Sequence, residues 1–189
     1  VGGSYLLPRM PHYGGFWMGL SGAQVAGFDA QTLGISTHML PHAEVDGLVQ
    51  ALCEDDAALD KALHTFCAAP GYQSSMLTLA TKTMCFDQST LCSIKDCLSK
   101  RTGAEIQEAQ QNLDKVSPRS LQETMRLLRR GHESSLAECL KREFDAVQRA
   151  IRHPDLAEGV RAVLVDKDHA PQWQSSPAQQ ADTPALTQP

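Results

Sequence analysis

The segment from Ile35 to Leu40 constrains the fold more than any other part of the sequence. Its apolar and polar residues alternate and Pro41 ends the pattern, which predicts one short β-strand. The remaining residues repeat their apolar side chains at helical spacing or are rich in turn formers. Because one strand cannot form a sheet by itself, we predict that it pairs with a segment that is missing or supplied by a partner.

Helical patterns account for most other residues, so the expected fold class is mainly α. Ser117 before a proline is a typical helix start, and Asp87 or Ser89 is the expected N-cap of an earlier helix. Asp55 and Asp56 are expected to form an N-terminal acidic cap within the helical stretch 43–69. The expected helices cover residues 3–9, 14–20, 27–34, 43–69, 86–98, 104–113, 118–131, 135–152 and 155–164.

The helix expected over 135–152 has the clearest apolar stripe, formed by Leu136, Leu140, Phe144, Val147 and Ile151. The surrounding region 117–153 holds eight Lys or Arg residues against five acids. This local excess is a candidate surface for RNA phosphates, although a solvated helix pair with interspersed ion pairs is the favoured interpretation. The RNA-facing candidates are Arg126, Arg129, Arg130, Lys141, Arg142 and Arg149.

The cysteines and histidines show no metal-site spacing. There is no C-x-x-C pair; Cys92 and Cys97 stand five apart, and His38 and His42 four apart. We therefore expect no metal and six unpaired thiols, including Cys85, which fit a reducing compartment such as the cytosol or mitochondrial matrix.

Charge and hydropathy exclude several classes of protein. A net charge of -5 argues against a dedicated nucleic-acid binder. No apolar run approaches the roughly 18 residues of a transmembrane helix, so no membrane partner is expected. The sequence starts at Val1 without a visible secretory signal, and we expect it to be a processed or partial chain. It also lacks a phosphate loop and a nucleophile elbow.

Several motifs nevertheless resemble a known family. They are Val1–Arg9 (VGGSYLLPR), Gly19–Ala23 (GLSGA), Gly34–His38 (GISTH), Cys85-Phe86, Ser117–Leu121 (SPRSL) and Glu158–Asp168 (EGVRAVLVDKD), followed by Pro171 and Trp173. Together they resemble the 3-hydroxyisobutyryl-CoA hydrolases, a branch of the crotonase (enoyl-CoA hydratase/isomerase) superfamily. The resemblance implies the C-terminal part of a ββα spiral whose sheet comes from elsewhere.

The resemblance also implies where the chemistry lies. In that family a glutamate, an aspartate and the oxyanion-hole amides hydrolyse a CoA thioester without a cofactor, and all of them precede the position of Val1. No catalytic residue is therefore carried over. Gly2 and Gly3 would edge the substrate pocket, unless they are simply packing glycines. Lys167 would approach a CoA phosphate, unless it is a solvated lysine between two aspartates.

The expected organisation is the end of a crotonase core over 1–54, a helical region over 55–173 and a disordered tail over 174–189. The favoured function is a noncatalytic or incomplete hydrolase-like subunit acting structurally in a larger assembly, with the small subunit of the mitochondrial ribosome as candidate. The alternative is the C-terminal portion of an active hydrolase in valine breakdown. The expected partners are the N-terminal half of the fold, mitochondrial ribosomal proteins and rRNA, and a CoA thioester if the protein is active. A mitochondrial location is implied.

The orphan strand and the glycine-rich start both need a sheet to pack on. We therefore expect residues 1–173, expressed alone, to be unstable or oligomeric. Thermal unfolding combined with analytical ultracentrifugation tests this, and a sharp cooperative melt of a monomer would contradict it.

Overall fold

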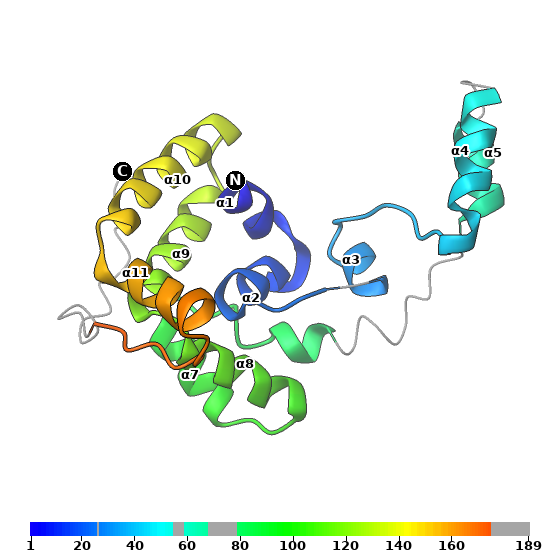
Figure 1. Ribbon diagram of the computed structural model, residues 1–189. Coiled ribbons are helices and arrows are strands. Elements are labelled where there is room, and N and C mark those ends of the chain that lie inside the picture. Colours follow the sequence, from blue (N-terminus) through cyan, green and yellow to red (C-terminus); the bar gives the residue numbers. More distant parts are fainter. Residues whose placement is uncertain (26, 55–58, 68–78, 175–189) are drawn as a thin grey trace.

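The computed structural model describes residues 1–25, 27–54, 59–67 and 79–174. Over these residues the chain is helical and forms no sheet, which confirms the mainly α prediction. Figure 1 shows a body built from α1, α2 and α7 to α11, with α4 and α5 lying apart from it. In the same residues no helix is both long and apolar enough to cross a bilayer.

The N-terminal residues form the short helices that their glycines predict. They are α1 (Gly3–Leu6), the 3-10 turns Leu7–Arg9 and Pro11–Tyr13, and α2 (Gly14–Ser21). A Cβ at Gly15 would lie 1.7 Å from the backbone oxygen of Leu7, so only glycine lets α2 approach this closely. Trp17 and Leu20 of α2 are buried as a result.

The core lies where α2 meets three further helices, α7 (Leu91–Ser99), α8 (Ala104–Lys115) and α9 (Pro118–Gly131). Ile94 and Leu98 of α7 are fully buried. Each such side chain contributes about 1.5–3 kcal/mol by its burial. The core residues are Met10, Trp17, Leu20, Leu33, Leu79, Cys85, Phe86, Ile94, Leu98, Ile106, Ala109, Leu113, Leu121 and Met125.

Two of the predicted helix caps lie in the described residues, and one of them forms. Ser117 accepts a hydrogen bond from the amide of Ser120 and starts α9, as expected. The N-cap of α7 is Thr90, which accepts from the amide of Ser93, so the prediction of Asp87 or Ser89 was wrong. Thr90 has the extended backbone of an N-cap and directly precedes the first helical residue, whereas the two predicted caps lie farther upstream in a turn and bend.

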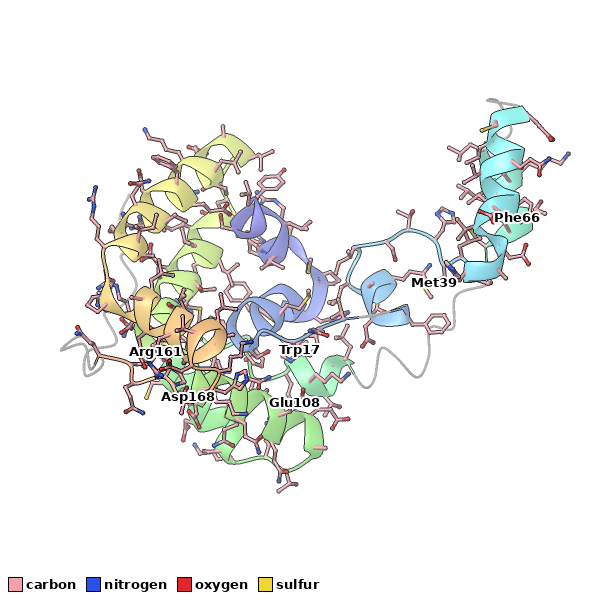
Figure 2. The ribbon with its side chains drawn as sticks, in the orientation of Figure 1. Trp17, Met39, Phe66, Glu108, Arg161 and Asp168 are labelled. Atoms are coloured by element: carbon pink, nitrogen blue, oxygen red, sulfur yellow. A yellow bond between two sulfur atoms is a disulfide. The ribbon has the colours of Figure 1, made fainter. Side chains whose placement is uncertain are left out.

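The predicted strand does not form. After α3 (Phe28–Thr32) the chain turns at Gly34, which has a φ of +72° and ends the helix as expected. Residues 35–40 then run as bends and coil, with a single bridge position at Met39. Figure 2 labels Met39 in this loop after α3. Ile35 is 43% exposed. A strand needs a neighbour for its amides and carbonyls, and the described part of the chain places none beside this segment.

Two helices form an arm outside the body. A 3-10 turn (His42–Glu44) leads into α4 (Val45–Glu54), which packs on α5 (Leu59–Phe66) where Gly47 faces the ring of Phe66. Figures 1 and 2 show this pair separate from the core. The expected cap at 55–56, the expected helix end near 70 and nearly all of the expected tail lie outside the described residues.

One disulfide corrects the expectation of free thiols. Cys85 and Cys97 are bonded, with their Cα atoms 5.6 Å apart, and join the turn after helix 79–83 to α7. Both residues belong to the core or pack on it, which brings together two sulfurs that are 12 residues apart in the sequence. The cysteines therefore do not indicate a reducing compartment.

Titration of the denatured, unreduced protein with a thiol reagent should count four thiols of the six cysteines, those of Cys53, Cys67, Cys92 and Cys139. Reduction should raise the count to six. Because closing a loop of this length stabilises by about 3 kcal/mol, reduction should also lower the melting temperature. Six thiols before reduction would contradict the pairing.

Candidate functional site

The main concave feature of the described residues is a groove between the last helices and the N-terminal turn. Its walls are α9, α10 (Leu136–Ile151), α11 (Pro154–Val160) and the π-helical turn Arg161–Val165, with the first residues of the chain at one edge. The groove encloses about 1980 Å³. Small-molecule pockets enclose about 300–1,000 Å³, so the groove has the size of an interface.

Apolar side chains line this groove but lack cover. The stripe predicted on the helix over 135–152 is present on α10, yet Phe144 is 64% exposed and Val147 is also exposed. Leu164, which follows α11, is 67% exposed. A contiguous apolar surface of this kind marks a site of interaction. The large exposed apolar residues that line the groove are Val1, Phe144, Val147, Leu156, Val160, Val163 and Leu164.

A carboxylate from α10 fixes the N-terminal edge of the groove. Glu143 accepts the amide of Gly2 on Oε2 at 2.7 Å and the amide of Ser4 on Oε1 at 2.8 Å. Partial burial raises the pKa of Glu143, but the hydrogen bonds from Ser4 and Gly2 outweigh it and lower the pKa below its ordinary value. Gly3 lines the groove, whereas Gly2, which has a left-handed conformation, does not; their place at the edge of a substrate pocket stays a prediction.

Arg9 holds the other end of the N-terminal turn, which begins at Gly2. Arg9 donates from Nη1 to the carbonyl oxygen of Gly131 at 2.8 Å and from Nη2 to that of Ser134 at 2.7 Å. A Cβ at Gly131 would lie 1.7 Å from the backbone oxygen of Ser4, so α1 rests directly on the end of α9. The short α1 is thus positioned by polar and close backbone contacts from both α9 and α10.

Four of the six predicted RNA-facing cations bind groups of the chain itself. Arg126 and Arg149 both pair with Glu123, whose burial raises its pKa less than these two guanidinium groups lower it. Arg129 donates to the carbonyl of Gln88. Arg142 donates to the backbone oxygen of Arg130 and to the sulfur of Cys139. The groove is lined by Arg126, Arg129, Arg130 and Arg149, and not by Lys141 or Arg142.

A second cluster organises the residues after α11. The Arg161 guanidinium binds Glu158 through two hydrogen bonds, of 2.9 and 2.7 Å. It also contacts Asp166 at 2.6 Å and Asp168 at 2.7 Å, and Figure 2 shows Arg161 and Asp168 side by side. These bonds from Arg161, with one from the amide of Gln172, lower the pKa of Glu158 to about 2. The cluster holds the segment 166–172 against the helix end.

Lys167, the predicted CoA-phosphate contact, lies on this held segment. It is exposed, has a φ of +55° and does not line the groove. Its neighbours Asp166 and Asp168 both turn to Arg161. The structure therefore does not bring Lys167 together with Gly2 and Gly3.

The residues that organise the site were not among those singled out from the sequence. Glu158 and Arg161 stand three apart on one helix face, a spacing that could have indicated their pairing. Glu143 gave no local signal, because its partners lie 139 and 141 residues away.

The Glu158 cluster predicts a pH dependence. Since the folded pKa of Glu158 is depressed from 4.5 to about 2, its contribution is complete above pH 4.5 and is lost as the pH falls toward 2. Trp173, just after the held segment, donates to the carbonyl of Lys115 at 2.9 Å, so its indole N–H resonance reports release. As the pH falls through this range, we expect the Trp173 resonance to change before that of the core residue Trp17. In Glu158→Gln we expect the Trp173 resonance to be changed already at neutral pH. Simultaneous loss of both resonances would contradict this.

Comparison with known proteins agrees with the sequence motifs. The profile of the enoyl-CoA hydratase/isomerase family matches residues 1–188. A probable 3-hydroxyisobutyryl-CoA hydrolase of Arabidopsis thaliana is 31% identical over 187 residues, and the alignment covers 92% of this chain and 50% of that protein. The mitochondrial 3-hydroxyisobutyryl-CoA hydrolase of Homo sapiens is 32% identical over 182 residues, covering 92% and 47%.

Solved structures show the same arrangement of helices. A carnitinyl-CoA dehydratase from Mycobacterium thermoresistibile superposes with a TM-score of 0.80 at 28% identity, over 94% of this chain and 52% of that one. An enoyl-CoA hydratase from Rhodobacter sphaeroides gives 0.78 at 32% identity, over 92% and 50%. The chain thus spans about half the length of the proteins that it matches. It belongs to the enoyl-CoA hydratase/isomerase, or crotonase, family.

Proposed function

We propose that this chain is the helical half of a 3-hydroxyisobutyryl-CoA hydrolase-like enzyme and works only together with the half of the fold that carries the sheet. The observation that carries this proposal is the uncovered apolar groove between α1, α9, α10 and α11. Its size and its exposed Phe144 and Leu164 suit a folded protein surface better than a small ligand.

The relatives are long enough to contain a cover for the groove. The apolar side chains of the groove are uncovered in the described part of the chain. The relatives are about twice as long as the stretch they share with this chain, so each contains enough additional protein to supply a cover. The occupant that we propose for the groove is therefore the other half of the same fold, on the same polypeptide or a separate one.

In this proposal the thioester chemistry is divided between the halves. The other half supplies the two carboxylates and the oxyanion-hole amides. This chain supplies the wall of the site, with Gly3 and Ser4 at its edge. Expelling water from the closed groove would strengthen the electrostatic stabilisation of the reacting carbonyl.

The purely structural role, including the ribosomal one, is less well supported. Four of the six candidate cations bind groups of the chain itself, which leaves fewer charges for phosphate. The Arabidopsis and human relatives are named as hydrolases, the former as a probable one, and the human one is named mitochondrial. The two solved structures are named as a dehydratase and a hydratase. We accordingly propose a mitochondrial location, and the ribosomal role stays a prediction.

The test compares this chain alone with the assembled protein, supplied with 3-hydroxyisobutyryl-CoA, by measuring release of the CoA thiol. We expect hydrolysis only by the assembled protein. Phe144→Arg places a charge in the covered groove and should reduce both activity and melting temperature, by about tenfold or more for activity. Phe144→Leu, the matched control, should stay within about twofold because it remains apolar.

Lack of hydrolysis by the assembled protein would contradict the proposal. Co-sedimentation of that inactive protein with ribosomal small subunits at moderate salt would favour the structural role instead.

A further inference from the structure

We propose that Glu143 is a positioning residue of the proposed hydrolase: it sets where the chain enters the site at Gly2. The inference rests on the proposed function, because the importance of Glu143 for catalysis depends on the other half of the fold closing over the groove beside this turn. Glu143 itself is not expected to touch the substrate.

The geometry is that of a clamp. Both carboxylate oxygens are used, one for the amide of Gly2 at 2.7 Å and one for the amide of Ser4 at 2.8 Å. Two bonds from one planar group to two nearby amides fix the orientation of the backbone as well as its position. The pKa of Glu143 is lowered, so the group is ionised at neutral pH and both bonds are charge-assisted.

The polar contacts of Glu143 and Arg9 hold a turn that is too short to be stable by itself. The helix α1 has only four residues, too few to be stable by itself. Val1 before the helix and Leu6 at its last position are exposed, while Ser4 is buried where α1 rests on the end of α9. Glu143 at the start of the turn and Arg9, through the carbonyl of Gly131, at its other end add directional contacts to this packing.

The position of this turn matters because it forms an edge of the groove. Val1, Gly3 and Ser4 all line the groove, so a shift at Gly2, which stands between Val1 and Gly3, moves this edge of the groove. A displacement of about 1 Å at a catalytic group costs up to about 100-fold in rate. Loss of the clamp should therefore slow the chemical step while leaving the groove able to bind.

The experiment uses the assembled protein. In Glu143→Gln only one side-chain oxygen remains to accept, and the amide NH₂ opposes one of the two backbone donors. We expect kcat to fall about 10- to 100-fold with KM within about twofold, and amide exchange at Gly2 and Ser4 to accelerate. Glu143→Asp keeps the charge but is one methylene shorter, so its kcat should lie between those of the wild type and Glu143→Gln. It replaces the glutamine variant in the test if that variant folds poorly.

The matched control is Glu138→Gln on the same helix. Glu138 also accepts a backbone amide, that of Ser135 at 2.8 Å, but it does not line the groove. This variant should lower the melting temperature without changing kcat. An unchanged kcat in both Glu143 variants would overturn the inference, as would an equal loss of kcat in Glu138→Gln.

Failure of the proposed function gives a different result. If the wild-type assembled protein does not hydrolyse the thioester, the proposed function falls and the catalytic meaning of Glu143 falls with it. Slow exchange at Gly2 and Ser4 that is lost in Glu143→Gln would then show that the clamp exists as a structural contact only.

Discussion

The apolar face of α10 and α11 is the constraint on which the rest of the molecule depends. Six groove-lining side chains, from Phe144 to Leu164, are about half exposed or more. Covering them would contribute about 5–9 kcal/mol at 1.5–3 kcal/mol for each fully buried side chain. That range is comparable with the whole stability of a typical domain, about 5–15 kcal/mol. In the proposed assembly, the half of the fold that covers this face would therefore contribute as much stability as a typical domain has.

Local signals predicted the parts of the fold that depend on local physics. Ser117 with its following proline starts α9, and the stripe from Leu136 to Ile151 spans α10. The strand at 35–40 failed because alternation records only a preference, whereas strand formation requires a neighbour with free amides and carbonyls. The disulfide between Cys85 and Cys97 was missed for a related reason. Their proximity follows from packing in the core, and the spacing of 12 residues carries no mark of it.

The candidate site shows the same division. The family motif contains both Glu158 and Arg161, and their spacing on a helix makes the pair predictable. It also contains Lys167, but the pattern does not reveal that Arg161 binds the aspartates on both sides of it and so fixes its segment away from the groove. Glu143 belongs to none of the motifs. Its role depends on α10 crossing beside the N-terminal turn, which only the tertiary structure shows.

The basic residues over 117–153 support two interpretations, a surface for phosphate groups and a helix pair held by ion pairs. An excess of cations over 117–153 suits a phosphate surface, but Arg126 of α9 and Arg149 of α10 share Glu123 of α9. The second of these pairs ties the two helices together across the wall of the groove, and Arg142 makes a further link to the backbone of Arg130. Because these contacts join the same helices whose apolar sides form the groove, we interpret the charges as part of what shapes that surface. The cations and the apolar stripe then serve one interface, with the polar contacts fixing the helix pair and the apolar side chains left for its cover.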